Sequence, residues 1–92
     1  MSDRVSAKFP IVNDLGLHAR AATKLVQLAS KYPCEVSLSH QGQSANAKSV
    51  MGVLLLCGSK GTIVEVTAIG AQCEECVKAI GELIASRFGE PS

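Results

Sequence analysis

NDLGLHARAA, residues 13–22, joins two segments of different hydrophobic periodicity. Before it, over residues 5–12, apolar and polar residues alternate, which predicts a β-strand. After it, over residues 19–32, apolar residues recur at helical spacing. His18 and Arg20 therefore lie where a strand gives way to a helix start. Because the N–H groups and dipole of a helix start attract anions, this stretch predicts an anion site that carries a nucleophile.

His18 and Arg20 have complementary phosphate chemistry. A neutral histidine carries a nucleophilic ring nitrogen, and an arginine presents a planar fork of donors that suits phosphate. We expect the backbone N–H groups of Ala19 and Arg20 to be the first donors to an added phosphate. We therefore predict that His18 takes up a phosphoryl group at a shallow site that a partner completes. The alternative is a surface histidine that only caps the helix.

The rest of the chain predicts one sheet and two more helices. Strands are expected at residues 34–39, 44–47 and 62–69, and helices at residues 49–56 and 72–88. In the last strand, Val64, Val66 and Ala68 are expected on one face. We expect His40, in a hairpin turn, to face solvent and the tail 89–92 to fray. The order β-α-β-β-α-β-α predicts an α+β open-faced sandwich, with one sheet covered on one face by helices.

The short helix after Ser49 is almost wholly apolar. Ser49 suits the N-cap position. A helix of about two turns on a small domain cannot bury its whole circumference, and an exposed apolar patch marks a partner site. We expect Val50 and Met51 to be exposed, and Val53 and Leu56 to be buried.

Composition limits the class of protein. The chain has 92 residues, a formal charge of +1 and 3% aromatic residues, which gives no broad case for binding nucleic acid or an anionic membrane. Its length predicts a single domain, residues 1–92, with a core from about residue 5 to residue 88. The longest apolar run, 53–57, is far too short to span a membrane, and Met1 to Arg4 lack a signal-peptide core. We expect a cytoplasmic monomer.

Four cysteines suggest a competing hypothesis. With 47% apolar residues and no export signal, reduced thiols are expected. Cys73-Glu74-Glu75-Cys76 is a CxxC at a helix start, where thiol pKa values can fall, so a thiol or metal-binding domain is an alternative. However, the helical stripe places Cys76 in the core, and the spacing to Cys34 and Cys57 does not match a zinc ribbon. We expect no metal and no cofactor.

Two motifs resemble one known family. Residues 15–20, LGLHAR, are similar to the active-site motif of HPr, the phosphocarrier of the bacterial sugar phosphotransferase system. Residues 48–53, KSVMGV, resemble that family's second motif, around its regulatory serine. The resemblance runs from Val5 to Phe88 without a gap. It implies a four-stranded antiparallel sheet with three helices on one face.

The resemblance also implies a function. Phospho-enzyme I would phosphorylate His18 on Nδ1, with phosphoenolpyruvate as the ultimate donor, and Arg20 would stabilise the phosphate. The group would then pass to a histidine of an enzyme IIA, so the protein is a substrate of partner enzymes and not itself an enzyme. Ser49 would be the target of an HPr kinase/phosphorylase. The expected partner surface comprises Leu17, Lys24, Val50 and Met51, although Lys24 could equally be an ordinary solvated lysine.

The chain departs from the family pattern at two places. Ala21 stands where the family usually has proline, which pre-sets a helix start; alanine is an excellent helix former, so we expect the geometry to survive. Leu56-Cys57-Gly58 stands where many members have Leu-Gly. The loop and this turn resemble proteobacterial and nitrogen-branch members. A mainly regulatory binding module, with Ser49 as its switch, is therefore the second hypothesis.

Overall fold

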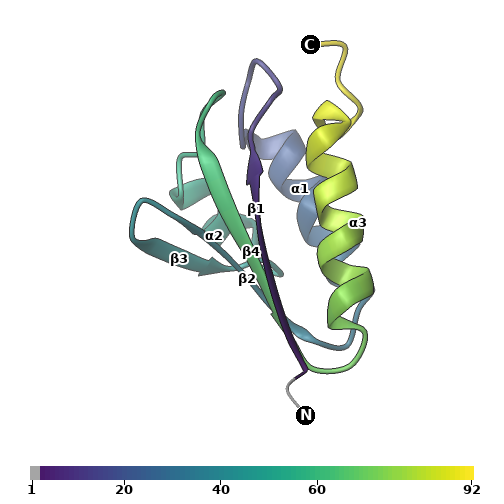
Figure 1. Ribbon diagram of the computed structural model, residues 1–92. Coiled ribbons are helices and arrows are strands. Elements are labelled where there is room, and N and C mark those ends of the chain that lie inside the picture. The colour runs from purple at the N-terminus through teal and green to yellow at the C-terminus, as the bar shows by residue number, and fades with distance from the viewer. Residues whose placement is uncertain (1–2) are drawn as a thin grey trace.

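The computed structural model describes residues 3–92 as one antiparallel sheet with its helices on one face (Figure 1). Met1 and Ser2, part of the segment considered above for an export signal, lie outside the described residues. Neighbouring strands pair antiparallel in the order β1-β4-β2-β3, which confirms the predicted open-faced α+β sandwich. The elements follow the predicted order: β1 (Arg4–Pro10), α1 (Ala19–Ala29), β2 (Glu35–His40), β3 (Gln43–Asn46), α2 (Val50–Leu55), β4 (Ile63–Ile69), α3 (Cys73–Ala85) and the short 3-10 helix η1 (Arg87–Gly89).

Strand β4 lies between β1 and β2 and supplies the centre of the sheet's buried face. Val64, Val66 and Ala68 are fully buried, as their alternation predicts. In the register of the sheet, Val66 pairs with Ala7 of β1 and with Leu38 of β2. Because successive side chains of a strand point to opposite faces, this row faces the helices and the intervening residues form the open face.

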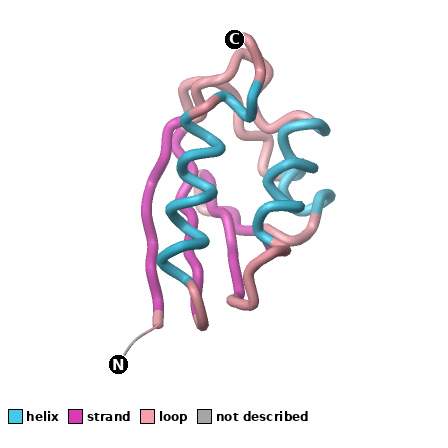
Figure 2. Tube along the Cα trace, turned by 90° about the vertical axis from the view of Figure 1, so that its right-hand side faces the viewer, coloured by secondary structure: helices cyan, strands magenta, loops and turns pink. Residues whose placement is uncertain are grey.

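Helices α1 and α3 form a layer over the buried face, seen from the helical side in Figure 2. Each helix turns one apolar stripe inward, where Leu25 of α1 and Ile80 of α3 are fully buried. Gly81 allows α3 to approach β1 closely, because a methyl group there would come within 2.6 Å of the Phe9 ring. None of the described helices is long and apolar enough to cross a membrane.

Helix α1 ends at Ala29, earlier than residue 32, where the periodicity ends. The chain continues in tighter turns, with the N–H of Lys31 donating to the carbonyl of Leu28. Beyond the helix, the Lys48 ammonium group donates to the carbonyl oxygens of Tyr32 at 2.7 Å and Cys34 at 2.8 Å. Lys48, which precedes the Ser49 cap, thus satisfies two backbone acceptors in the connection between α1 and β2.

The C-terminal segment does not extend α3 to Phe88, and the prediction that the tail frays is wrong for the part that contacts the domain. Helix α3 ends at Ala85, and Arg87 and Phe88 then adopt positive φ values of 61° and 55°. This reversal buries the Phe88 side chain completely. It also brings Glu90 against the loop that precedes α1, where Asn13 donates to its carboxylate.

Helix α2 buries one side against the domain and exposes the other. Ser49 caps it, accepting a hydrogen bond from the N–H of Gly52 at 3.1 Å. Val53 and Leu56 are buried and Met51 is 69% exposed, as predicted, whereas Val50 is only half-buried.

The prediction that His40 faces solvent is wrong. His40 ends β2 with a side chain that is 8% exposed, and its Nδ1 lies 3.3 Å from the carbonyl oxygen of Ile63. The hairpin turn is made by Gln41 and Gly42, both at positive φ, so His40 belongs to the strand and not to the tip.

Candidate functional site

The loop between β1 and α1 is fixed to the turn that follows α2. The N–H of Leu17 donates to the carbonyl of Gly58 at 2.8 Å. Gly16 has a φ of 65°, and a methyl group there would overlap that carbonyl, so only glycine fits this approach without a shift. Lys60 adds an exposed ion pair with Asp14 at 2.7 Å. The loop is thus held in one position before the chain reaches His18.

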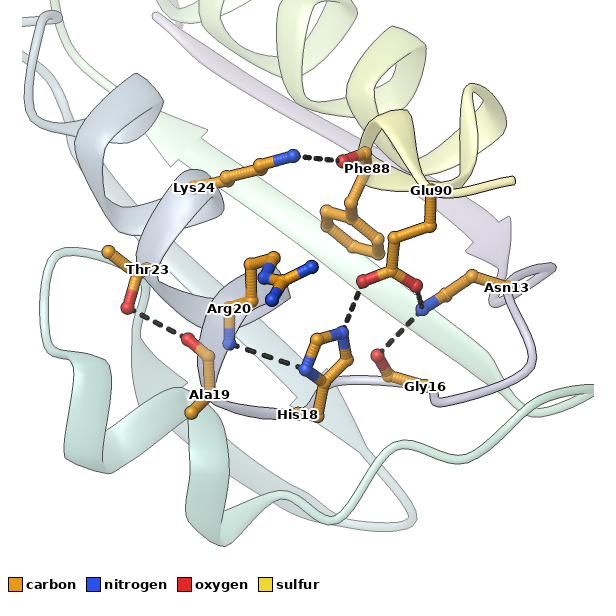
Figure 3. Close-up of polar contacts among 9 residues, drawn as sticks. All are labelled: Asn13, Gly16, His18, Ala19, Arg20, Thr23, Lys24, Phe88 and Glu90. Carbon is orange, nitrogen blue, oxygen red and sulfur yellow. Dashed lines mark hydrogen bonds and ion pairs between the residues drawn. The ribbon is translucent and has the colours of Figure 1, made fainter. Parts of the chain in front are cut away.

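His18 is the N-cap residue of α1. Its backbone is extended, with φ −78° and ψ 177°, and its Nδ1 accepts a hydrogen bond from the N–H of Arg20 at 3.3 Å. Its Nε2 contacts a carboxylate oxygen of Glu90 (Figure 3). These partners assign the tautomer: Nδ1 carries the lone pair and Nε2 carries the proton. The side chain is 26% exposed, so the imidazole is held in place but reachable.

Arg20 and the start of α1 give this site a positive character. The guanidinium group is exposed and lies beside the imidazole, near the Glu90 carboxylate (Figure 3). The N–H of Ala22 already bonds to the carbonyl of His18, which leaves the first N–H groups of the helix, from Ala19 onward, directed out of its end. A helix start with an arginine beside it favours a bound anion.

Glu90 is a site residue that neither sequence motif contains. One of its carboxylate oxygens accepts from Nδ2 of Asn13 at 2.9 Å and the other contacts Nε2 of His18. Hydrogen bonds from Asn13 and His18, with the nearby charge of Arg20, hold the pKa of the Glu90 carboxyl below its ordinary value. Glu90 lies 72 positions from His18 in the chain, and no local pattern signals their contact.

Asn13 is bonded to both segments that meet at the contact between His18 and Glu90. Its Nδ2 also donates to the carbonyl of Gly16 at 2.9 Å, so one fully buried amide links the loop to Glu90. Its Oδ1 is a buried side-chain atom without a partner among the described residues. An amide with two donor bonds can serve two acceptors, which explains the choice of asparagine at this point.

The predicted partner-surface residues have different environments. Leu17 is 5% exposed and packs on Gly58, so its side chain offers a partner little surface. Lys24 is half-buried and donates to the carbonyl of Phe88 at 2.6 Å. Among the described residues, exposed large apolar side chains include Leu15, Met51 and Leu55, each about 70% exposed. The first lies in the His18 loop and the other two on α2, which packs against α1.

Ala21, which replaces the usual proline, is fully buried in the first turn of α1. The helix begins regularly at Ala19 with an extended N-cap residue, so the expected geometry is present. In the turn after α2, Cys57 adopts a positive φ of 54° and exposes its side chain, while Gly58 packs beneath Leu17.

The cysteines do not assemble a metal centre in the described part of the chain. No group of three or more His, Cys, Asp or Glu side chains among residues 3–92 is arranged to hold a metal ion. Cys34, Cys73 and Cys76 are buried, whereas Cys57 is exposed. Burial, together with the neighbouring Cys34 thiol, raises the pKa of Cys76 to about 12, so its thiolate is strongly disfavoured.

An open-faced α+β domain with a reachable histidine capping a helix start, and an arginine beside it, has the chemistry that suits a protein carrying a phosphoryl group. A family model for the PTS HPr component phosphorylation site matches residues 5–86. Phosphocarrier protein HPr of Xylella fastidiosa is 46% identical over 80 residues, which cover 87% of this chain and 90% of that protein. The chain belongs to the HPr family, the phosphocarriers of the phosphotransferase system.

Solved structures of the same family have this fold. A crystal structure of HPr from Thermoanaerobacter tengcongensis superposes with a TM-score of 0.92 at 40% identity, covering 96% of this chain and 99% of that one. A second structure from the same organism, described as an HPr dimer, has a TM-score of 0.76 at 44% identity, covering 87% of this chain and 92% of that one.

Proposed function

We propose that His18 accepts a phosphoryl group on Nδ1 from phospho-enzyme I and passes it to a histidine of an enzyme IIA. The observation that carries this proposal is the position of the imidazole: Nδ1 faces the start of α1 with its lone pair, while Nε2–H faces Glu90. A nucleophile must present a lone pair to phosphorus, and Nδ1 is the ring atom that has one.

The transfer step follows from this arrangement. Nδ1 attacks the phosphorus atom, the new P–N bond forms as the bond to the donor breaks, and Nε2 keeps its proton. The N–H of Arg20, which donates to Nδ1 in the free protein, is then placed to donate to a phosphate oxygen. The guanidinium of Arg20 and the helix start neutralise the added charge, and such positioning and electrostatic stabilisation supply most of phosphoryl-transfer catalysis.

A carrier must also release the phosphoryl group from His18 to the next protein. His18 lies at an open surface with a single arginine side chain beside it, so the group is stabilised but not enclosed. A deeper site would slow the onward step because it would stabilise the phosphorylated ground state. The protein is therefore a substrate of its partner enzymes, which complete the site.

The docking surface is proposed to surround His18 and extend over α2. Met51 and the half-buried Val50 supply apolar contact, and the structure adds the exposed side chains of Leu15 and Leu55. Lys24 is proposed to act at its edge through charge, since its ammonium group also bonds to the C-terminal segment. Apolar side chains grouped in this way are suited to a protein partner.

Ser49 is proposed as a site of regulatory phosphorylation by an HPr kinase/phosphorylase. Its half-buried hydroxyl caps α2 next to Val50 and Met51. A phosphate at a helix start is tolerated by the helix itself, so its effect would be negative charge within the docking surface. The second candidate function, a mainly regulatory binding module, rests on this same position of Ser49.

The decisive experiment is phosphorylation by purified enzyme I and phosphoenolpyruvate, read by mass spectrometry and by acid lability of the product. Wild type is expected to gain one acid-labile phosphate and to donate it to enzyme IIA. In analytical ultracentrifugation it is expected to sediment as a monomer. His18→Ala should gain none. An acid-labile phosphate on His18→Ala would refute the assignment. Labelling of Ser49 by HPr kinase with none of His18 by enzyme I would support the regulatory module instead.

A further inference from the structure

The Glu90 carboxylate contacts the nitrogen of His18 that does not take the phosphoryl group. It faces Nε2, whereas Nδ1 faces the helix start. The Glu90 side chain is only 8% exposed, so solvent competes poorly for its hydrogen bonds. A buried carboxylate on the far nitrogen of an imidazole fixes its tautomer and stabilises its cation, as in other histidine sites where the second nitrogen has an acidic partner.

The contact is built by several anchors and is not a chance approach of a loose tail. The Phe88 ring is fully buried two residues earlier, and its carbonyl accepts from the Lys24 ammonium group at 2.6 Å. Asn13 holds one carboxylate oxygen of Glu90, which leaves the other for His18. The buried Phe88 ring, the bond from Lys24 to the Phe88 carbonyl and the buried Asn13 amide therefore hold the Glu90 carboxylate in position.

The chemistry of the imidazole shows what such a carboxylate contributes. When Nδ1 forms a bond to phosphorus and Nε2 keeps its proton, the ring becomes a cation. An anionic acceptor on Nε2–H stabilises that cation more than it stabilises the neutral ring. It also keeps the proton on Nε2, so that the Nδ1 lone pair is available before the partner arrives.

We propose that Glu90 is a positioning residue for phosphoryl transfer, which holds the Nε2–H tautomer of His18 and stabilises the ring cation formed when Nδ1 is phosphorylated. This inference rests on the proposed function of His18. The groups facing the ring are Glu90 from the C-terminal segment, Arg20 from α1 and the neutral amide of Asn13 from the loop. Among them, Glu90 is the one anion.

Glu90→Gln tests the charge with little change in shape. A glutamine has one acceptor oxygen, so it cannot keep the present arrangement in which Asn13 and His18 bond different oxygens, and it lacks the charge. Phosphorylation by enzyme I and phosphoenolpyruvate should slow roughly tenfold, since the bond lost is to a charged group. The equilibrium with phospho-enzyme I should also shift toward unphosphorylated protein, because the phosphorylated ring loses its stabilising anion. Glu90→Asp, which keeps the charge, should recover part of the rate.

A second measurement needs no partner. The ¹⁵N chemical shifts of His18 distinguish the two neutral tautomers. In wild type they should report Nε2–H, and in Glu90→Gln they should move toward a mixture. A merely structural role would change stability without moving the tautomer. Glu35→Gln is the matched control, because Glu35 is exposed and pairs with Ile69 at the end of the sheet opposite to the His18 loop. It should leave the rate and the shifts unchanged.

The outcomes separate the two proposals. If wild type is not phosphorylated on His18, the proposed function fails and this inference falls with it. If wild type is phosphorylated while Glu90→Gln matches it in rate and in ¹⁵N shifts, only the role of Glu90 is refuted. A faster Glu90→Gln also refutes it, because the carboxylate would then obstruct the site that we propose it prepares.

Discussion

Lys24 and Phe88 lie 64 positions apart in the chain, yet the Lys24 ammonium group donates to the Phe88 carbonyl oxygen at 2.6 Å. This bond joins α1, whose N-cap residue is His18, to the segment that carries Glu90. The helix capped by His18 and the segment that carries Glu90 are therefore joined directly by a side-chain bond. An ordinary solvated lysine would not couple them.

Lys24→Met should release the C-terminal segment while keeping the side chain's length. We expect a loss of about 1 kcal/mol in the free energy of unfolding, the usual net contribution of one hydrogen bond. The ¹⁵N shifts of His18 should also move toward a tautomer mixture. Urea unfolding and NMR measure the two effects. Lys31→Met is the control, since Lys31 is exposed and makes no side-chain bond within residues 3–92. Equal stabilities for the two variants would contradict the coupling.

Gly16→Ala should destabilise the loop before His18. The alanine would have to hold the φ of 65° that glycine adopts here, which is unfavourable for a residue with a side chain. Its methyl group would also overlap the Gly58 carbonyl oxygen. Together these effects should cost at least about 2 kcal/mol and slow phosphorylation. Gly42→Ala is the matched control: its φ is 80°, but nothing lies within 4 Å of the added group, so only the backbone cost of about 1 kcal/mol remains. Similar losses in both would show that the packing on Gly58 adds nothing.

Ser49 variants should separate capping from charge. Ser49→Ala removes the acceptor for the Gly52 N–H and should lower stability by about 1 kcal/mol. Ser49→Asp also caps a helix and should keep most of the stability. Its charge beside Met51 should weaken binding to enzyme I, measured by calorimetry. Unaltered binding by Ser49→Asp would argue against Ser49 as a switch.

The Glu90 carboxylate should also make the free energy of unfolding depend on pH in the acid range. Because its folded-state pKa lies below the ordinary value of 4.5, the stability it contributes is fully present above that value and is lost as the pH falls below it. The difference in unfolding free energy between wild type and Glu90→Gln should therefore shrink between pH 5.5 and pH 3. A constant difference would mean that the carboxylate charge contributes nothing.

Thiol reactivity should divide the cysteines by burial. In the native protein, Cys57 should react rapidly with a thiol reagent because it is exposed. Cys34, Cys73 and Cys76 should react only after unfolding, and the raised pKa of Cys76 slows it further. Peptide mapping of the alkylated protein identifies the labelled sites. Rapid labelling of Cys73 would revive the thiol hypothesis that its CxxC suggests.

The sequence predicts well whatever depends on local periodicity. The alternation of Val64, Val66 and Ala68 sets the buried face of β4, and the Ser49 cap sets the start of α2. His18 and Arg20 follow from their place at a strand-to-helix junction. In each case, the residues that decide the structure are neighbours in the chain.

What the sequence could not predict depends on contacts across the fold. Arg87 and Phe88 take positive φ values that non-glycine residues rarely adopt, so the reversal of the tail has no local signal. Glu90 consequently has no motif. The burial of Leu17 depends on Gly58, and the position of His40 depends on the exact length of β2. These side chains take their environment from distant segments, which periodicity does not describe.

The reversal after α3 also determines where a foreign polypeptide can be attached. Ser92 is two residues from Glu90, so anything joined after it emerges beside the histidine and the surface proposed for its partners. Asp3 precedes β1 at the other end of the molecule, where β1 pairs with the last residues of β4 (Figure 1). An affinity tag or fluorescent label should therefore be joined ahead of β1, because a tag after Ser92 would lie close to His18 and would disturb the binding that it is meant to measure.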